Sequence, residues 1–207
     1  MSARMAGDAP VAPAGKRPLI YAGIGSRDTP PQILQVMTPL AEKMDGLGWR
    51  LRSGGAAGAD AAFEAGVSDP RHRAIYLPQS SFNGRAAGTG GYINASRLPT
   101  WQQALATVSQ YHPHPGALSS FAVNLMARNA YQVLGPQLNQ PARMIVAWAP
   151  GGYEEAAPPP GWREGGTGQA LRIARAWNAE NPDQRIEIRN LANPQRLAGA
   201  LRYLGLS

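Results

Sequence analysis

The stretch SGGAAGAD at Ser53–Asp60 decides the fold of this chain, and a related stretch, GIGSR, lies upstream at Gly23–Arg27. Each follows a short apolar run and precedes a pattern of apolar residues at helical spacing. Glycine lets the backbone approach an anion closely, and the first turn of a helix offers unpaired N–H groups and a positive dipole end. Two such turns on neighbouring strands predict one cradle of the size of a phosphate.

Short apolar segments alternate with helical patterns along the rest of the chain, without the signals of tandem hairpins. This order requires crossover connections, and these predict an α/β fold, a Rossmann-like three-layer parallel sheet with helices on both faces. Ligands of such sheets lie beyond the carboxyl ends of the strands. Strands are expected at 18–22, 49–52, 74–77, 144–148 and 186–188, and helices after Thr29, after Asp60, at 101–109, at 117–134, after Gly168 and at 196–204.

Two of the expected helices have a clear apolar face, because their apolar residues recur every three or four positions. The helix after Thr29 is expected to bury Ile33, Val36, Met37, Leu40, Met44 and Leu47, and the helix at 117–134 is expected to bury Leu118, Phe121, Leu125, Met126 and Val133.

We expect a disordered tail at 1–17 and a single nucleotide-binding domain at 18–207, because the first residues are rich in Ala, Gly and Pro and lack periodicity. Residues 78–99 are expected to form a long loop, and 151–164 an insertion with three consecutive prolines. No apolar run approaches the ~20 residues of a membrane span, and no signal peptide is recognisable. A cytoplasmic location is therefore expected, with no membrane partner.

The amino-acid composition excludes several kinds of site and raises the question of nucleic-acid binding. The chain has no cysteine, which excludes disulfides, thiolate zinc sites and thiol catalysis. Its net charge is +7, but only Lys16 and Lys43 among the 20 basic residues are lysines, and the arginines are scattered singly. The charge has two interpretations: a surface for nucleic acid, or the coding bias of a GC-rich genome with a few arginines at a ligand site.

The first glycine stretch is an incomplete dinucleotide fingerprint. Asp28 stands where the third glycine should be, and no acidic residue ends the second strand to hold a ribose. Binding of NAD in the usual mode is therefore not expected. The pair Ser26 and Arg27 favours an anion, because a guanidinium can hold phosphate bidentately while the hydroxyl donates a further hydrogen bond. A tight turn without a ligand is the alternative.

In the second stretch, Gly54 and Gly55 can aim N–H groups inward and Gly58 permits close approach where the helix begins. Asp60 has two possible roles: it caps the helix, or it hydrogen-bonds ribose hydroxyls. Glu64 lies one turn further along and shares the same helix face, so the two could form a carboxylate pair. A solvated position on the helix surface is the other interpretation of Glu64.

These motifs resemble the Rossmann-like core of the DNA-processing protein A family, which loads recombinase onto single-stranded DNA. They are also similar to the wider SLOG superfamily, which includes the LONELY GUY phosphoribohydrolases and sensors of ADP-ribose-type signals. Arg128-Asn129, the strand at 145–148 and the run GGTGQA at Gly165–Ala170 resemble that superfamily's arginine-bearing helix and second glycine turn. The likeness spans Pro18 to Asn190, and small phage-type or bacterial members look nearest. It implies a phosphate cradle and a homo-oligomer, and it makes a phosphate or ribose contact of Arg128 an alternative to a structural salt bridge.

The chain also departs from this pattern. Phosphoribohydrolases of this type carry glutamates just after the second glycine turn, whereas Gln169–Arg172 contains no carboxylate. The run PGGYEE at Pro150–Glu155 looks closer by eye, but Pro158–Pro160 follow it, so it cannot begin the required helix.

Three functions follow from these observations. The chain could bind a phosphorylated nucleoside or an ADP-ribose-like nucleotide, with phosphate held by Ser26, Arg27 and the N–H groups of residues 54–58. It could hydrolyse a nucleoside monophosphate at the N-glycosidic bond, with Asp60, Glu64 and Arg128 as the catalytic candidates. It could bind single-stranded DNA over the glycine turns. No metal or cofactor is expected. The expected ligand contacts are Gly25, Ser26, Arg27, Ser53, Gly54, Gly55, Gly58, Asp60, Arg128, Asn129, Gly165, Gly166, Thr167, Gly168 and Gln169.

Overall fold

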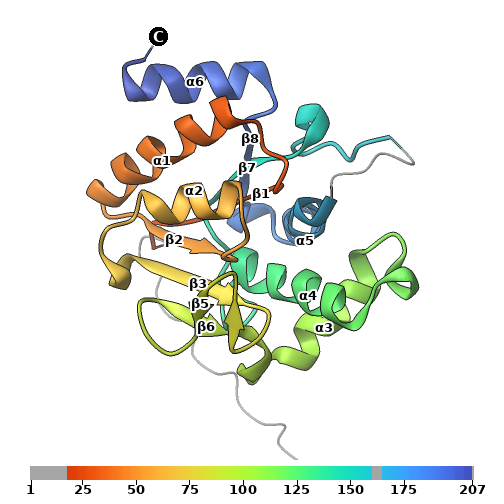
Figure 1. Ribbon diagram of the computed structural model, residues 1–207. Helices are drawn as coiled ribbons and strands as arrows, with labels where there is room; N and C mark the ends of the chain where they lie inside the picture. The colour runs from red at the N-terminus through yellow and green to blue at the C-terminus, as the bar shows by residue number, and fades with distance from the viewer. Residues whose placement is uncertain (1–17, 160–164, 207) are drawn as a thin grey trace, which may run out of the picture.

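The fold is centred on a six-stranded sheet in which every strand pair is parallel (Figure 1). A computed structural model describes residues 18–159 and 165–206. The strand order is β6-β3-β2-β1-β7-β8, which confirms the expected α/β class. The strands are β1 (Ile20–Gly25), β2 (Arg50–Ser53), β3 (Arg73–Leu77), β6 (Tyr92–Asn94), β7 (Met144–Trp148) and β8 (Glu187–Asn190).

Helices cover both faces of this sheet. Along β1 the side chains alternate: Tyr21 joins the apolar cluster under one set of helices, and Ala22 and Ile24 join the cluster under the other. Figure 1 shows α1, α2 and α6 on one side and α3, α4 and α5 on the other. The helices are α1 (Pro31–Gly46), α2 (Ala59–Ala65), α3 (Trp101–Tyr111), α4 (Ser120–Leu134), α5 (Gly165–Glu180) and α6 (Pro194–Leu204).

Strand β1 lies at the point where the chain changes direction across the sheet. The chain passes from β1 outward through β2 to β3 and β6, and then returns to the other side of β1 to form β7 and β8. The expected first strand, 18–22, was placed too early. The strand runs to Gly25, and Gly23 and Gly25 pair with Val146 and Trp148 of β7. The first glycine stretch is therefore largely strand, and the turn begins at Ser26.

Packing of α2 against β1 explains why Gly23 and Gly25 are glycines. A Cβ atom on Gly23 would lie 2.6 Å from Cγ of Phe63, and one on Gly25 would lie 2.5 Å from Cβ of Ala59. Both distances are far below van der Waals contact. The missing side chains thus allow α2 to lie directly on the central strand.

The long segment 78–99 is not simply a loop. It contains an antiparallel pair, β4 (Ser81–Phe82) and β5 (Arg85–Ala86), and then β6, which adds a parallel edge strand next to β3. The sequence signal was weak because each of these strands has only two or three residues. Short 3₁₀ turns lie at Pro70–His72, Ala95–Arg97, Pro115–Ala117, Pro150–Gly152 and Pro182–Gln184.

Helix α4 is buried more completely than its apolar pattern predicts. Every residue from Ala127 to Leu134 is buried, including polar residues, because α3, α5 and the sheet surround this half of the helix. Its N-terminal half is more open, and Phe121, expected in the core, is 44% exposed. Leu47, expected on the buried face of α1, lies just beyond that helix and is 57% exposed.

The run Gly165–Gly168, expected as a turn, forms the first turn of α5. The proposed tail at 1–17 and the end of the 151–164 insertion lie outside the described residues, so those assignments stay predictions. Within 18–159 and 165–206, no helix combines the length and the apolarity needed to cross a bilayer.

The close packing at Gly25 yields a test. Gly25→Ala should destabilise the protein by about 1–3 kcal/mol, because the added methyl group must displace α2. Gly46→Ala is the matched control: its Cβ would have no neighbour within 4 Å, at the end of α1, and a small stabilisation is expected. Urea denaturation measures both. Equal effects of the two substitutions would contradict the packing role of Gly25.

Candidate functional site

A pocket of about 350 Å³ opens where β1 ends, between the first glycine stretch, α4 and the start of α5. This is the edge of the sheet, next to the change in strand direction, where ligands of open α/β sheets bind. Eight of the residues expected to contact a ligand line it: Gly25, Ser26, Arg27, Asp60, Arg128, Asn129, Gly166 and Thr167.

The other expected ligand residues lie outside the pocket lining, and most have structural contacts. The Ser53 hydroxyl is buried and donates to the carbonyl of Gly23 at 2.7 Å. Gly58 precedes α2 at φ 81°, and a Cβ there would lie 2.8 Å from the carbonyl oxygen of Ser26. Gly58 therefore brings the two glycine stretches together. Gly54, Gly55, Gly165, Gly168 and Gln169 complete the set that does not line the pocket.

Asp60 is the anion on which the two glycine stretches converge. Its carboxylate accepts a hydrogen bond from the amide of Ala56 at 3.2 Å, and the amides of Gly25 and Gly54 also hydrogen-bond it. Asp60 occupies the second position of α2, after Gly58, so it does not cap the helix in the usual way. The expectation that the amides of residues 54–58 hold a ligand phosphate needs correction, because the protein's own carboxylate occupies two of them.

Arg128 fills the space above the second glycine stretch. Its Nη1 lies 3.7 Å from Oδ2 of Asp60, and both side chains are almost fully buried. A Cβ on Gly54 would lie 1.1 Å from that same Nη1, so the glycine is needed to make room for the guanidinium. Gln132 completes the arrangement: with its side-chain amide oriented so that the oxygen faces these donors, it accepts from Arg128 Nη1 at 2.9 Å and from the amide of Gly54 at 2.7 Å.

Burial dominates the electrostatics of this pair. It raises the pKa of Asp60, and the nearby Arg128 and the backbone amides oppose that rise. Burial likewise lowers the pKa of Arg128, opposed by Asp60. Each charge is therefore tolerated inside the protein chiefly because the other is present.

Two residues of the pocket lining each hold a buried polar atom that has no hydrogen-bond partner in the described part of the chain. Nε of Arg128 and Oγ1 of Thr167 are both inaccessible to solvent, and neither has a hydrogen-bond partner among residues 18–159 and 165–206. Leaving a buried polar atom unpaired costs about 1–3 kcal/mol. The two residues come from different helices, α4 and α5, and both line this pocket. They indicate a place where a ligand could supply the missing hydrogen bonds.

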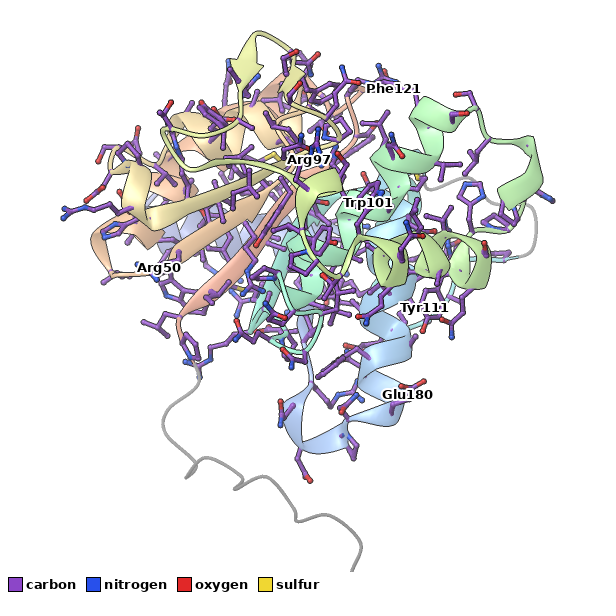
Figure 2. All side chains as sticks on the ribbon, turned by 90° about the horizontal axis from the view of Figure 1, so that it is seen from below. Arg50, Arg97, Trp101, Tyr111, Phe121 and Glu180 are labelled. Carbon is purple, nitrogen blue, oxygen red and sulfur yellow. The ribbon has the colours of Figure 1, made fainter. Side chains whose placement is uncertain are left out.

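Aromatic side chains border the same pocket. Phe82, carried by β4, lies 6.2 Å from Phe121 between ring centroids, and the Arg128 guanidinium lies 6.0 Å from the Phe82 ring. Figure 2 shows Phe121 at the surface, at the beginning of α4. The apolar helical pattern predicted Phe121 in the core, whereas the structure leaves its ring 44% exposed at the border of the pocket.

Glu64 is neither solvated nor paired with Asp60. It is buried, its carboxylate pairs with Nε of Arg85 at 2.8 Å, and it accepts from the hydroxyl of Tyr92 at 2.5 Å. Burial and the contact with Glu64 raise the pKa of Tyr92. Glu64 therefore holds β5 and β6 against α2 and does not line the pocket.

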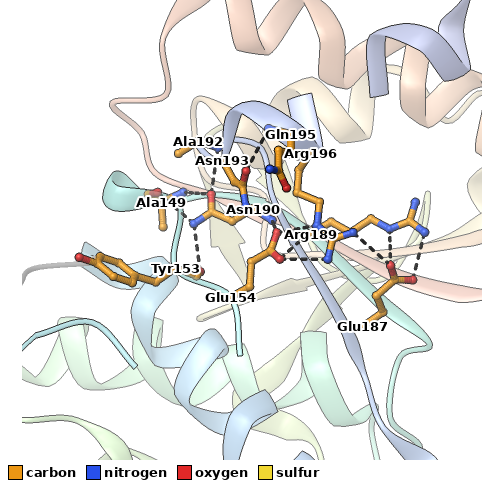
Figure 3. A network of polar contacts seen from close by, with 10 residues as sticks. All are labelled: Ala149, Tyr153, Glu154, Glu187, Arg189, Asn190, Ala192, Asn193, Gln195 and Arg196. Carbon is orange, nitrogen blue, oxygen red and sulfur yellow. Dashed lines mark hydrogen bonds and ion pairs between the residues drawn. The ribbon is translucent and has the colours of Figure 1, made fainter. Parts of the chain in front are cut away.

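The acidic residues of the insertion are also structural. Glu154 pairs with Arg196 of α6 at 2.9 Å and accepts from the amide of Asn190 at 3.0 Å (Figure 3). Glu155 pairs with Arg185 at 2.6 Å. Both contacts tie the insertion to the β8 edge of the sheet. The run Pro150–Glu155 does not begin a helix that could present these carboxylates to a ligand, as expected from its prolines.

No protein-family model matches the chain, and no curated protein sequence matches it. Among solved structures it is similar to DNA processing protein A from Helicobacter pylori, whose structure was determined to explain a unique mode of single-stranded DNA binding. The TM-score is 0.51, with 14% identity over 91% of this chain and 80% of the other. At this identity the likeness shows the shared fold, which confirms the fold implied by the sequence resemblance.

The buried ion pair yields a prediction. Asp60→Asn should destabilise the protein by about 3–5 kcal/mol, because it leaves the Arg128 guanidinium buried without a counter-charge. Glu187→Gln is the control, since it breaks an ion pair with Arg189 that is about half exposed and should cost about 1 kcal/mol or less. Chemical denaturation measures both free energies of unfolding. A small effect of Asp60→Asn would show that Asp60 does not hold Arg128 in place.

Proposed function

We propose that this chain is a nucleotide-binding protein of the SLOG type, which holds a phosphorylated nucleoside or an ADP-ribose-like nucleotide in the pocket at the end of β1. The observation that carries the proposal is the pair of unpartnered buried atoms, Arg128 Nε and Thr167 Oγ1. Both are hydrogen-bond donors, and they line one pocket from two helices. Phosphate and ribose oxygens are acceptors of the kind that both donors lack.

Further features support a phosphate in this pocket. Arg27 is exposed at its edge and Ser26 lies beside it, so a guanidinium and a hydroxyl are available to an anion. Gly166 and Thr167 belong to the first turn of α5, a helix of 16 residues, where backbone N–H groups and the helix dipole favour negative charge. The phosphate position we propose therefore lies at α5 and Arg27, not at the amides of residues 54–58.

The aromatic residues support a base next to that phosphate. Phe121 presents a partly exposed ring at the border of the pocket, with Phe82 beside it. Stacking on such a ring stabilises a bound base by about 1–3 kcal/mol and tolerates any base, since every base has a π-face. Asn83 and Asn129 also line the pocket and supply amide groups for hydrogen bonding.

We propose ligand binding and no catalytic step. The carboxylates that line the pocket in the described part of the chain are Asp28, which is exposed, and Asp60, which is paired with Arg128. Glu64 lies outside the pocket and pairs with Arg85. No observation therefore favours N-glycosidic hydrolysis over binding.

Thr167→Val tests the proposal, because valine has nearly the same shape without the hydroxyl. We expect the ligand-free variant to be as stable as the parent or more stable by about 1 kcal/mol, since an unpaired buried hydroxyl is removed. We expect nucleotide affinity to fall about tenfold, because the ligand loses a hydrogen bond. Calorimetry against AMP, ADP-ribose and cyclic nucleotides measures affinity, and thermal melting measures stability.

The controls separate binding from folding. Thr38→Val removes a hydroxyl that donates to the Ala62 carbonyl at 3.0 Å, away from the pocket, so it should lower stability and leave affinity unchanged. Arg27→Ala, at an exposed residue, should lower affinity and leave stability unchanged. The parent protein failing to bind any nucleotide of the panel would overturn the proposal.

Single-stranded DNA is a second candidate ligand for this pocket. The specific observation in its favour is the shared fold with DNA processing protein A from Helicobacter pylori, studied for its single-stranded DNA binding. The net charge of +7 and the exposed ring of Phe121 are compatible with a nucleotide unit of a longer strand occupying the pocket.

Salt dependence distinguishes this candidate. If the protein contacts at least two phosphates of a single strand, log K should fall with log salt with a slope of about −1.4 or steeper between about 50 and 200 mM salt. Arg27→Ala should make the slope shallower by about 0.7, and Arg97→Ala, in the 3₁₀ turn after the edge strand β6 and outside the pocket lining, should not change it. Fluorescence anisotropy with labelled oligo-dT measures the slopes. Oligo-dT binding that does not respond to salt would exclude this candidate.

A further inference from the structure

A second and larger cavity, of about 860 Å³, forms a groove between α1, α6 and strands β7 and β8. None of its lining residues lines the pocket at the end of β1. The groove exists because α6 covers the sheet loosely: this helix has a strong apolar side, yet none of its residues is fully buried. Figure 1 shows α6 beside α1, at the outer side of the molecule.

The floor of the groove is aliphatic. Leu40 and Met44 of α1, Val146 of β7 and Leu191 after β8 line it and belong to the apolar cluster on this face of the sheet. Ala200 of α6 lines it from the other side. A groove of this kind accepts apolar side chains of a partner, because their burial removes apolar surface from water on both sides.

The rim of the groove is strongly basic. Glu187 is the acidic residue of its lining, and it already contacts Arg189 at 2.8 Å and Arg196 at 3.7 Å. Figure 3 shows these side chains gathered on β8 and α6. Glu154 and Glu155 pair with two of the rim arginines from outside the groove. The arginines that line the groove are Arg143, Arg185, Arg189, Arg196 and Arg202.

Two of these arginines carry the excess charge. Arg143 and Arg202 are exposed, and neither has a carboxylate within ion-pair distance in the described chain. Arg143 lies over the ring of Trp49, with its guanidinium 5.9 Å from the ring centroid. The groove therefore combines a hydrophobic floor with two guanidinium groups that lack counter-charges, and it complements a partner that is acidic as well as apolar.

The aromatic residues of the groove make nucleic acid the poorer fit. A single strand binds through bases that stack on open aromatic faces. Here Arg143 lies over the ring of Trp49, and Lys43 lies over the ring of Tyr203, 4.2 Å from its centroid, although Tyr203 stays 42% exposed. The floor between α1 and α6 is aliphatic and offers no stacking surface. Charge alone would suit either class of partner, but the floor favours the apolar side chains of a protein.

We propose that this groove is a docking site for an acidic peptide segment of a partner protein. Its apolar side chains would lie on the floor between α1 and α6, and its carboxylates would pair with Arg143 and Arg202. The two components act together, so neither charge nor apolarity alone would suffice.

Defined peptides test this proposal on the full chain. The probe is a fluorescein-labelled peptide of three Glu-Glu-Leu-Phe repeats, and its binding is measured by anisotropy. Arg143→Ala and Arg202→Ala should each raise its Kd about threefold, as expected for a surface ion pair, and the double variant about tenfold. Arg97→Ala, on the opposite edge of the sheet, removes the same charge and should leave the Kd unchanged.

Substitutions at Gly199 give a matched pair within the groove. This residue lines the groove on α6, and a Cβ there would have Arg202 Nη2, at 3.9 Å, as its nearest neighbour. Gly199→Ala and Gly199→Glu should therefore both fold, and thermal melting checks this. The glutamate places a carboxylate beside Arg202 and repels acidic peptides, so it should raise the Kd about tenfold or more, whereas alanine should not.

Three outcomes would overturn the proposal. The first is equal binding of a Gln-Gln-Leu-Phe peptide, which would show that charge is irrelevant. The second is equal binding of polyglutamate of the same length, which would show that the floor is irrelevant. The third is binding of oligo-dT that weakens with Arg143→Ala, Arg202→Ala and Gly199→Glu, which would make the groove a nucleic-acid surface. Nucleotide binding at the other pocket should be unaffected by these variants.

Discussion

The ion pair between Asp60 and Arg128 connects the segments that meet at the end of β1. The Asp60 carboxylate accepts hydrogen bonds from backbone amides of both glycine stretches. The Arg128 guanidinium packs against Gly54 and so places the middle of α4 over that glycine. Because both charges are buried, each is tolerated chiefly because the other is in place. The pair therefore sets the position of α2 relative to α4, and with it one wall of the pocket. It also leaves Arg128 Nε unpartnered beside that pocket.

Most of the fold could be predicted from the sequence, because apolar segments of four or five residues alternate with helical patterns over the whole sheet. The missed strand, β6, has three residues within a Gly-rich segment, too few for a periodic signal. The strand limits at Gly23 and Gly25 could not be predicted either. Such glycines are typical of a turn, whereas here they lie in a strand, and their lack of side chains leaves room for Phe63 and Ala59.

The location of the candidate site could be predicted from the sequence, but the contacts of its residues could not. Glycines and an arginine identified the place, because their backbone freedom and charge are local properties of the sequence. Their partners are not local. Nothing near Asp60 indicates Arg128, and nothing near Glu64 indicates Arg85 or Tyr92. Gln132 was missed because a glutamine within an apolar helix carries no signal of its own until its neighbours are known.

The burial of α4 from Ala127 to Leu134 has a consequence for how variation in this chain is interpreted. A helix enclosed on all sides lacks a solvent-facing stripe on which side chains can change at little cost. Random mutagenesis would therefore report this half-helix as uniformly intolerant, whatever the protein does. Intolerance at Arg128 or Asn129 would by itself say nothing about ligand binding. Only substitutions at residues nearer the opening of the pocket, such as Phe121, could distinguish a loss of binding from a loss of stability.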